Sequence, residues 1–532
     1  MKGLAVGKVK IGVYALESLT TGMYNEPLDA VREYVQNAAD AIREAERCGI
    51  LQEREGRLMV EVSAGSRQLT LRDNGVGVRQ QEVPERLLDI GMSGKDMVRS
   101  AGFRGIGRLA GIAYCDKLAF WTSAAGEDVA TLLEINCREI RRAMSAKKRE
   151  VEEIQEVFKR CTALTAKPYR AAEHFFEVCL HGVCPQADSF LDVAALSTYL
   201  GQIAPLDFDG QRFFYASKIA EWLAAHRLTI PSVTLVVRSG SVERQIQKPY
   251  KTHYRTSARG GAGINDVQVR DVGFYPEAPS ADAPFWCWYG ITDLLGSIDD
   301  SESAGFRLRQ HNINLGGADR VAELFEAIAA SNRRFNKYFV GEIHVLSPDV
   351  IPNARRDGFE TNAAWEEIRE QLMGFIGSLC EDIRAKSSAR NMPTAKVIGK
   401  ADKVIRDVSE RLKQGLASRT ERDTLIKRVK QITDTAEKAV AGRTNGQDSE
   451  TVQKAVNRLG RLEKRLLDHN SFVGRKMPST LGRKERKVME RVMAVIHDSL
   501  SHRACPDREE CEKKLRSEIM AAIEGREDGS DE

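Results

Sequence analysis

The chain has 532 residues, and its 80 Lys and Arg nearly balance its 76 Asp and Glu, leaving a net charge of +4. Its length predicts three or four domains of about 150 residues each, and so small a net charge does not indicate a particular partner. No apolar run approaches the ~20 residues of a membrane-spanning helix, and the ten cysteines lack paired C-x-x-C spacing. We therefore expect a cytoplasmic protein with reduced thiols and no membrane association.

The first predicted elements are a strand and a long amphipathic helix. Apolar side chains at every second position of residues 9–15 predict the strand. Residues 25–47 carry a proline in the first turn and apolar residues at helical spacing, which predicts the helix. Glu33, Asn37 and Asp40 stand at i, i+4 and i+7, so they share the face opposite the apolar stripe. Such a face is either exposed to solvent or part of a functional site, and this helix alone does not distinguish the two.

A predicted β-hairpin follows the helix. Residues 58–62 and 68–72 alternate between apolar and polar side chains and are joined by a short turn. The second strand leads into Asp73, and Gly75 and Gly77 would let the backbone bend close to a ligand. An ordinary Asp-Asn-Gly turn is the alternative interpretation.

The next segment is rich in glycine. Gly102, Gly105 and Gly107 precede an apolar helical run, so their backbone N–H groups could bind phosphate at a helix N-terminus. Lys95 in the same segment is either a phosphate ligand or a solvated lysine. The order of elements does not fit a Rossmann fingerprint, and the chain has no G-x-x-x-x-G-K-[ST] sequence, which excludes a P-loop enzyme.

Two α/β regions are predicted before residue 360. Strands at residues 118–122 and 130–136 continue the first region, and charged helical sequence follows. From about residue 205 to 360, strands again alternate with helices, which predicts a second α/β unit. Its predicted strands lie at residues 233–238, 286–290, 306–309 and 341–345. We interpret the aromatic residues of the second of these strands as core residues and not as a surface for stacking bases.

Beyond residue 360, helical patterns dominate. Residues 425–439 and 452–466 each carry apolar side chains at steps of four and three, the spacing of a heptad repeat. This spacing suits an antiparallel helix pair or a partner helix. Residues 403–487 contain 22 Lys and Arg against 11 Asp and Glu, a local excess of positive charge. Residues 524–532 form an acidic tail that we expect to be disordered.

The motifs E-x-x-x-N-x-x-D-A, D-x-G-x-G and G-x-x-G-x-G occur in that order, and together they resemble the GHKL ATPases. This superfamily includes DNA gyrase B, the heat-shock-90 chaperones, histidine kinases and MutL-type proteins. The resemblance implies ATP and Mg²⁺ as cofactors. Glu33 would orient and deprotonate the attacking water, and Asn37 would hold Mg²⁺.

The same resemblance implies roles for the remaining candidate residues. Asp73 would accept a hydrogen bond from the adenine amino group. Asp40 and Gly77 would support the adenine pocket, with Gly75 in the same loop. The phosphates would be wrapped beneath a lid by Gly102, Gly105 and Gly107, and Lys95 would be within reach of them.

A second stretch, residues 339–357, resembles the middle-domain segment of heat-shock-90 proteins, in which an arginine reaches the terminal phosphate of the nucleotide. The matching position is Arg356, with Asn353 nearby and Arg355 as an extra basic neighbour. An arginine suits this role because its planar fork binds phosphate oxygens in pairs and stays charged. The local sequence is V-I-P-N where the family has L-P-L-N. The alternative interpretation is an arginine that only braces a loop.

The resemblance implies an α+β fold. Residues 1–200 would form a Bergerat-type ATP-binding α/β sandwich, and residues 205–360 a heat-shock-90-like middle α/β domain. Residues 361–523 would form a basic, partly coiled-coil helical region before the acidic tail.

The implied function is slow Mg-dependent ATP hydrolysis by a homodimeric clamp that acts on a client or partner protein. The predicted N-terminal strand would cross to the second subunit of this dimer. The alternative is a nucleic-acid clamp of the MORC or MutL kind that binds through the basic C-terminal helices, with bacterial antiphage defence as one setting.

Overall fold

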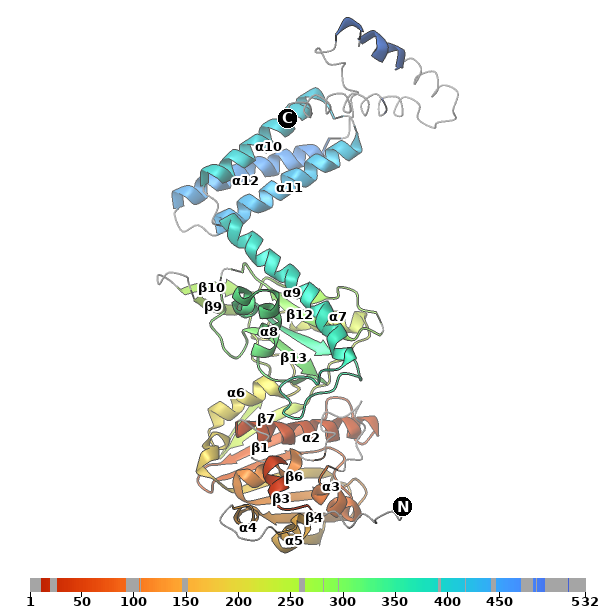
Figure 1. The fold of residues 1–532 in the computed structure, drawn as a ribbon, viewed down its shortest axis with the longest axis vertical. Helices are drawn as coiled ribbons and strands as arrows, with labels where there is room; N and C mark the ends of the chain where they lie inside the picture. The colour runs from red at the N-terminus through yellow and green to blue at the C-terminus, as the bar shows by residue number, and fades with distance from the viewer. Residues whose placement is uncertain are drawn as a thin grey trace, which may run out of the picture. The chain divides into compact units, whose positions relative to one another are not determined.

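The chain divides into two compact units, Met1–Cys380 and Glu381–Glu532 (Figure 1). The computed structural model describes residues 11–19, 26–91, 105, 107–145, 152–257, 264–280, 282–294, 296–390, 394–416, 418–441, 446–469, 482–484, 486–492 and 515.

An eight-stranded sheet forms the base of the first unit. Its strands are β1 (Arg57–Ser63), β2 (Gln68–Asp73), β3 (Cys115–Ser123), β4 (Val129–Asn136), β5 (Thr162–Pro168), β6 (Phe175–Val183), β7 (Thr234–Ser239) and β8 (Val242–Ile246). Their order is β5-β4-β3-β6-β2-β1-β7-β8, and neighbours are antiparallel except for β1 and β7. The predicted hairpin is confirmed, since Leu58 pairs with Asp73 and Ser63 with Gln68.

Helices share one hydrophobic core with one face of this sheet. They are α1 (Tyr14–Leu19), α2 (Leu28–Arg47), α3 (Val83–Leu88), α4 (Cys137–Ala143), α5 (Ile154–Cys161), α6 (Val193–Ile203) and the 3₁₀ helices η2 (Gly107–Ala113) and η3 (Pro185–Phe190). The short 3₁₀ helix η1 (Gln80–Glu82) has no buried residue. In β2, Leu69 and Leu71 are buried while Thr70 and Arg72 are half-buried, which is the alternation expected of a strand with one core face. On α2, Val31, Val35 and Ile42 enter the same core.

A five-stranded sheet follows in the same unit. Its strands are β11 (Asp271–Tyr275), β12 (Phe285–Ile291), β13 (Gly305–Gln310), β14 (Ile313–Asn314) and β15 (Val340–Val345), in the order β11-β12-β15-β13-β14. The remaining elements of this region are the hairpin β9 (His253–Ser257) and β10 (Ile264–Gln268), the helices α7 (Ala216–Ala225), α8 (Asp319–Ile328) and α9 (Ala363–Arg390), and the 3₁₀ helix η4 (Ala330–Tyr338). Trp286 and Trp288 are almost fully buried, which confirms their interpretation as core residues.

Two predicted strands are placed differently. In the described part of residues 9–15, Gly12 forms an isolated antiparallel β-bridge with Glu153, but the predicted strand is wrong from Tyr14 onward, where α1 begins. Residues 1–10 lie outside the described part. The strand predicted at residues 233–238 exists as β7, but it runs parallel beside β1 and belongs to the first sheet. The first sheet therefore extends past the predicted limit at residue 200.

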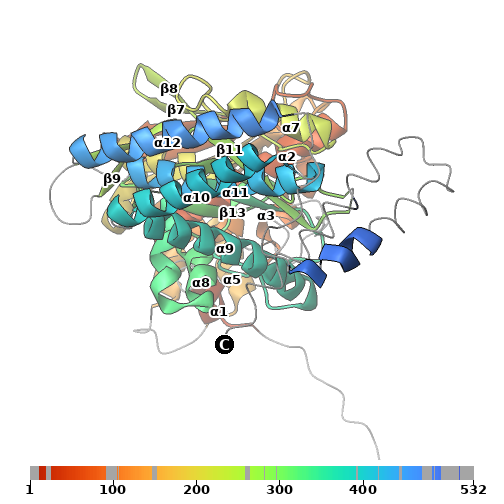
Figure 2. The same ribbon diagram turned by 90° about the horizontal axis from the view of Figure 1, so that it is seen from above.

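The second unit contains α10 (Thr394–Gln414), α11 (Arg419–Ala441) and α12 (Gly446–Leu467), which run side by side in both views (Figures 1 and 2). Arg422 near the start of α11 donates to the carbonyl of His469 just beyond α12, so these two helices are antiparallel. The heptad positions Val429 and Leu459 lie in a core shared by all three helices. The predicted antiparallel helix pair is therefore present, and α10 packs against it as a third helix.

Two further predictions concern the chain as a whole. The eight cysteines within the described part are all free thiols. Among the described helices, none has the combination of length and apolar character that crossing a bilayer requires. The acidic tail lies outside the described residues.

Candidate functional site

The polar face of α2 lies inside the protein. Glu33 and Asp40 are 6% and 7% exposed, and Asn37 between them is half-buried. The alternative of a solvated face is therefore wrong for both carboxylates. Seven residues separate them, which places them about 10 Å apart along the helix axis. A buried carboxylate costs free energy unless it has partners, so each end of this face needs neighbouring groups that compensate the carboxylate.

Asp40 lies near the loop that follows β2. Asp73, the last residue of β2, is buried, and its Oδ1 accepts the N–H of Gly75 at 2.8 Å. The N–H of Val76 donates to the carbonyl of Ala41 on α2 at 3.2 Å. A Cβ on Gly75 would lie 2.6 Å from the Ala41 backbone, so only glycine permits this close approach. The predicted residues Asp73 and Gly75 thus lie against α2 at Ala41, next to Asp40, whose carboxylate forms an ion pair with Arg43.

Gly77 continues this loop in a conformation that a side chain would not allow. Its φ is +67°, and an added Cβ would lie 2.0 Å from the carbonyl oxygen of Ser123 on β3. The neighbouring Thr122 is buried, accepts the N–H of Val78 at 2.9 Å and donates to the carbonyl of Phe175 at 2.9 Å. Thr122 was not singled out from the sequence, although a threonine on the core face of an apolar strand is a signal that could have identified it.

Glu33, at the other end of the α2 face, faces the glycine-rich segment. An added Cβ on Gly107 would lie 2.0 Å from Oε2 of Glu33, so the backbone of this glycine passes directly over the carboxylate. Gly105 has a φ of +68°, a conformation that favours glycine. The helical run after Gly107 is the 3₁₀ helix η2, a tighter helix than the one predicted. Lys95 and Gly102 lie outside the described residues.

Two residues that the sequence analysis missed fasten η2 in place. The hydroxyl of Tyr34 donates to the carbonyl of Arg108 at 3.2 Å and accepts the N–H of Gly111 at 2.8 Å. The guanidinium of Arg108 donates to the carbonyls of Leu87 at 3.0 Å and Gly105 at 2.7 Å. Burial lowers the pKa of Arg108 to about 10, so the group still carries its charge at neutral pH. The position of Tyr34 directly after Glu33 was the available signal.

A loop after β15 brings Arg356 to the same carboxylate. Nε of Arg356 lies 3.4 Å from Oε1 of Glu33, and both side chains are buried. Oε1 of Glu33 therefore faces the arginine while Oε2 faces Gly107. The sequence predicted that these segments would meet, and the structure brings them into contact.

The conformation of this loop is strained and braced. Arg356 has a φ of +56°, which costs free energy for a residue with a side chain. Its N–H donates to the carbonyl of Asn353 at 3.1 Å, and Nδ2 of Asn353 donates to Asp357 at 2.6 Å. Asp357 also forms an ion pair of 2.7 Å with Arg320 at the start of α8. Burial would raise the pKa of Asp357, but Asn353 and Arg320 outweigh it, so the pKa is lowered and the brace stays charged.

A second bridge runs parallel to the first. Nη2 of Arg32 donates to the carbonyl of Arg355 at 2.8 Å, and Nη1 lies 3.4 Å from Asp29. Arg32 precedes Glu33 and Arg355 precedes Arg356, so two consecutive residues of α2 meet two consecutive residues of the loop. The loop is therefore fixed against the start of α2 at two points.

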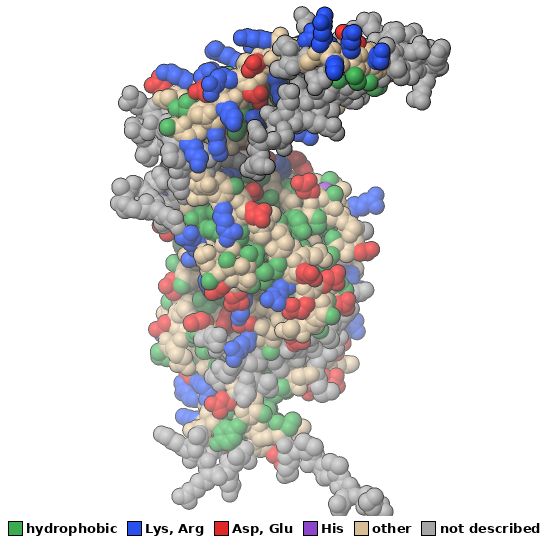
Figure 3. Space-filling model, turned by 45° about the horizontal axis from the view of Figure 1, so that its top comes forward, with side chains coloured by type: hydrophobic (Ala, Val, Ile, Leu, Met, Phe, Trp, Pro, Cys, Tyr) green, Lys and Arg blue, Asp and Glu red, His purple; other side chains and the backbone are tan. Residues whose placement is uncertain are grey.

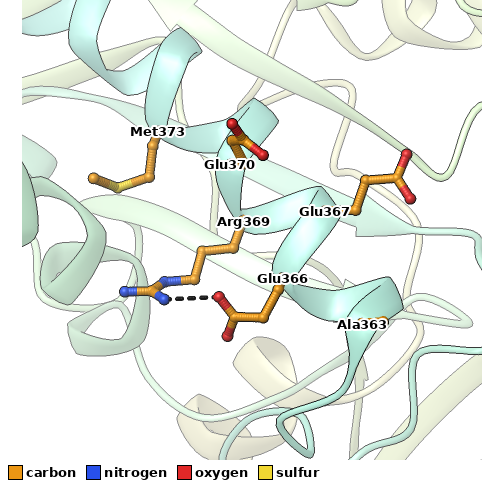
Figure 4. A pocket seen from close by; sticks show the side chains of 6 residues that line it. All are labelled: Ala363, Glu366, Glu367, Arg369, Glu370 and Met373. Atoms are coloured by element: carbon orange, nitrogen blue, oxygen red, sulfur yellow. Dashed lines mark hydrogen bonds and ion pairs between the residues drawn. The ribbon is translucent and has the colours of Figure 1, made fainter.

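A surface hollow of about 570 Å³ along the first turns of α9 contains none of these residues. Figure 4 shows its lining, in which Arg369 and Glu366 form an ion pair of 2.9 Å. The six lining residues are Ala363, Glu366, Glu367, Arg369, Glu370 and Met373. All come from a single helix, so no groups from separate elements converge there as they do around Glu33.

The residues around α2 fit an adenine nucleotide with Mg²⁺. At one end lie the buried carboxylate of Asp73 and the closely packed glycines of the loop after β2. At the other end, the carboxylate of Glu33 lies beside Arg356 and Gly107. Asn37 between them offers an amide oxygen, and Mg²⁺ binds such hard ligands together with phosphate oxygens. The described ranges contain no cluster of three or more His, Cys, Asp or Glu that could hold a metal by itself. The expectation that Asn37 would hold Mg²⁺ together with the phosphates is compatible with its position between Glu33 and Asp40 on α2.

An α/β layer with a polar helix face above a sheet, an aspartate-glycine loop and a glycine-rich segment defines the GHKL class of ATP-binding domain. Residues 24–165 match the family model for histidine kinase-, DNA gyrase B-, and HSP90-like ATPase. The chain is also 32% identical over 129 residues to the chaperone protein HtpG of Polaromonas naphthalenivorans (strain CJ2). That match covers 21% of this chain and about a fifth, 20%, of the relative. The matched N-terminal part of this chain is thus similar to the ATP-binding domain of GHKL, HSP90-like ATPases.

Proposed function

We propose that this chain hydrolyses ATP with the help of Mg²⁺ and uses the reaction to drive a homodimeric conformational clamp that acts on a client or partner protein. The observation that carries the proposal is the 3.4 Å contact between Glu33 of α2 and Arg356 of the loop after β15. A carboxylate and a guanidinium from distant parts of the chain meet at the glycine-rich segment, where the resemblance places the terminal phosphate.

The adenine end of the nucleotide would lie against Asp73, Asp40 and the close-packed Gly75 and Gly77. Asp73 keeps one oxygen on the Gly75 N–H, which orients its carboxylate for the adenine amino group. The phosphates would extend along α2 towards Glu33, past the amide of Asn37. The ~10 Å rise between Asp40 and Glu33 suits this arrangement, since both ends of the nucleotide then meet one helix.

Glu33 would act as the general base. Its carboxylate lies between Arg356 and the Gly107 backbone, so a water held there would be close to both the base and the terminal phosphate. Arg356 would stabilise the charge that develops on the transferring phosphoryl group. A buried guanidinium is effective in this role because electrostatic interactions are stronger where water is excluded.

The clamp mechanism follows from where Arg356 comes from. Because this arginine belongs to the second α/β region, hydrolysis would proceed only while that region packs against the start of α2. Packing and hydrolysis would then be coupled, and turnover would be slow because it waits for the packed state. The name of the matched relative, a chaperone protein, supports a client protein as the target.

A Glu33→Gln substitution tests the assignment of the base. The amide keeps the size of the side chain but cannot take a proton, so ATP binding should persist while hydrolysis falls by ~10²–10⁴. Calorimetric titration with ATP and a phosphate-release assay measure the two quantities. A variant that hydrolysed ATP at the wild-type rate would show that Glu33 is not the base.

A nucleic-acid clamp remains the second candidate because of the surface of the C-terminal helices. Lys454, Arg458, Arg461 and Arg465 are exposed on α12 at steps of four, three and four, so they form one stripe. Lys and Arg side chains gather over these helices (Figure 3). Stimulation of ATPase activity by DNA and by an unfolded protein, compared at two salt concentrations, separates the two functions. A phosphate-contact mode should weaken steeply as salt rises.

A further inference from the structure

The two segments that form the contact between Glu33 and Arg356 also contribute to the lining of a polar cavity of about 220 Å³. Arg32 and Arg355 are both part of this lining, and each is the chain neighbour of one residue of that contact. The volume is ample for one tetrahedral oxyanion with several waters, each of which occupies about 30 Å³.

The lining changes from buried to exposed. Arg32 and Asn314 are buried, whereas Arg355 and Gly317 are exposed. The cavity therefore opens to the surface of the first unit.

The chemistry of the lining favours an oxyanion. Arg355 supplies fixed positive charge and paired donors, whereas the guanidinium of Arg32 is shared with Asp29 and the Arg355 carbonyl. Gly316 and Gly317 lead into α8, which begins without a side-chain cap, and such a helix start favours negative charge. Asn314 also lines the cavity, and within the described residues its side-chain oxygen is buried without a hydrogen-bond partner, so it could accept a hydrogen bond from the P–OH group of hydrogen phosphate.

The two carboxylates in the lining are already occupied by cations and donors. Asp29 lies 3.4 Å from Arg32 and accepts the hydroxyl of Tyr199 at 3.1 Å. Asp357 is paired with Arg320 and accepts Nδ2 of Asn353. Their charges are therefore compensated, and Arg355 adds positive charge beyond this balance.

We propose that this cavity is an exit-side binding site for inorganic phosphate, through which the product of hydrolysis passes from Arg356 to Arg355 and Arg32 and then to solvent. The proposal rests on the proposed ATPase function, because that function supplies the phosphate at Arg356. It adds a route by which phosphate leaves while the nucleotide is still bound.

Phosphate binding can be tested without hydrolysis. Inorganic phosphate is titrated into the full chain, with and without ADP and Mg²⁺, and followed by the ³¹P linewidth. Gly317→Leu fills the cavity without backbone strain, because its φ is ordinary and no atom lies nearer than 4.0 Å to an added Cβ. Gly65→Leu, in the turn between β1 and β2, is the matched control, since an added Cβ there has no neighbour within 4 Å. The cavity variant should bind phosphate about tenfold or more weakly, and the control should match the wild type.

Arg355→Glu is a second variant that keeps the proposal testable if Gly317→Leu folds poorly. Its exposed position makes it tolerable to the fold, and the reversed charge should weaken phosphate binding by at least the same factor. Arg244→Glu reverses an exposed charge on β8, outside the lining of the cavity, and is its control. Wild-type phosphate affinity in both cavity variants would overturn the proposal.

Single-turnover kinetics test the exit route. Acid quenching measures cleavage, and a fluorescent phosphate sensor measures release. In both cavity variants, release should become several-fold slower relative to cleavage, while Gly65→Leu keeps the wild-type ratio. An unchanged ratio would contradict the exit route. If the wild type cleaved no ATP, the proposed function would fail, whereas the phosphate titration would still decide whether the site exists.

Discussion

Glu33 owes its position to three constraints that act on single residues. The apolar stripe of α2 fixes the helix on the sheet, so residue 33 must face the glycine-rich segment. Gly107 lacks the Cβ that would occupy the place of Oε2, and Arg356 pairs with Oε1. Each carboxylate oxygen thus has its own neighbour, which explains how a buried charge is tolerated.

Residue 77 requires glycine for two reasons, a close approach to Ser123 and a left-handed φ, and substitutions can separate them. Gly77→Ala must place a Cβ 2.0 Å from the Ser123 carbonyl and also hold a left-handed φ. Gly126 is the matched control, since it has a φ of +85° but no atom within 4 Å of an added Cβ. We expect Gly126→Ala to lower the free energy of unfolding by about 1 kcal/mol and Gly77→Ala by about 3 kcal/mol or more. Equal losses in chemical denaturation would show that the approach to Ser123 is not constraining.

At the scale of elements, a fully buried ionic cluster connects the two sheets. Glu342 on β15 lies 2.6 Å from Nζ of Lys248, forms an ion pair with Arg309 and accepts Nε1 of Trp288 at 3.2 Å. His344 on the same strand is 3.0 Å from Glu342. Lys248 follows β8 of the first sheet, whereas the other groups belong to the second. Burial would raise the pKa of Glu342, but Arg309 and Lys248 hold it well below its usual range.

This cluster predicts a loss of stability in acid. Burial lowers the pKa of His344 from 6.5 to about 4 despite the nearby Glu342, so between these values the unfolded chain binds a proton that the folded chain does not. The free energy of unfolding should fall as pH drops from 6.5 to 4, by up to about 3 kcal/mol. Below about pH 4.5 the lowered pKa of Glu342 acts in the same direction. Lys248, with a pKa lowered by burial to about 7, is mostly protonated at pH 6.5 and becomes fully protonated as the pH falls.

His344→Phe is the control for this prediction. A phenyl ring can keep the stacking on Trp286, where the ring centroids are 4.4 Å apart, but it cannot titrate. Denaturant unfolding of both proteins at pH 6.5 and 4 should therefore show a smaller difference for the variant. An equal pH dependence in the two proteins would mean that His344 does not contribute.

Sequence patterns predicted those elements whose periodicity is set by one core face. The hairpin β1–β2, the helix α2 and the heptad positions of α11 and α12 follow from apolar spacing alone. β7 was assigned to the wrong sheet because the apolar pattern of a strand does not indicate which neighbouring strand it pairs with. The hydrogen bonds by which Asn353 and Asp357 hold the loop around Arg356 were also not predicted, since the left-handed φ at residue 356 depends on tertiary contacts.

In the whole molecule, the domain that holds the candidate site extends far outside the matched segment 24–165. β6 lies between β3 and β2 in its sheet, β7 and β8 form one edge, and Arg356 reaches the buried Glu33 from beyond the second sheet. A domain defined by sequence similarity alone therefore lacks an inner strand and an edge of its own sheet, together with the proposed catalytic arginine.

Truncation tests this dependence. A chain ending after residue 247 keeps all eight strands and α2, so it should bind ATP, but cleavage should be tens-fold slower because Arg356 is missing. A chain ending at residue 200 also loses β7, which pairs with β1, and should melt at a lower temperature than the longer one. Wild-type cleavage by either truncated chain would contradict the role of the second α/β region.

If Glu33 and Arg356 act together on the terminal phosphate, the rate of single-turnover cleavage must depend on the side chain at residue 356. Arg356→Ala should slow cleavage by tens-fold while the Kd for ATP stays within about twofold, because the contact matters most in the transition state. Arg356→Lys should recover little of the loss, since an ammonium group lacks the guanidinium fork. Arg333→Ala, which removes an exposed arginine of η4, should leave both quantities unchanged. Cleavage at the wild-type rate by Arg356→Ala would show that this arginine does not act on the terminal phosphate.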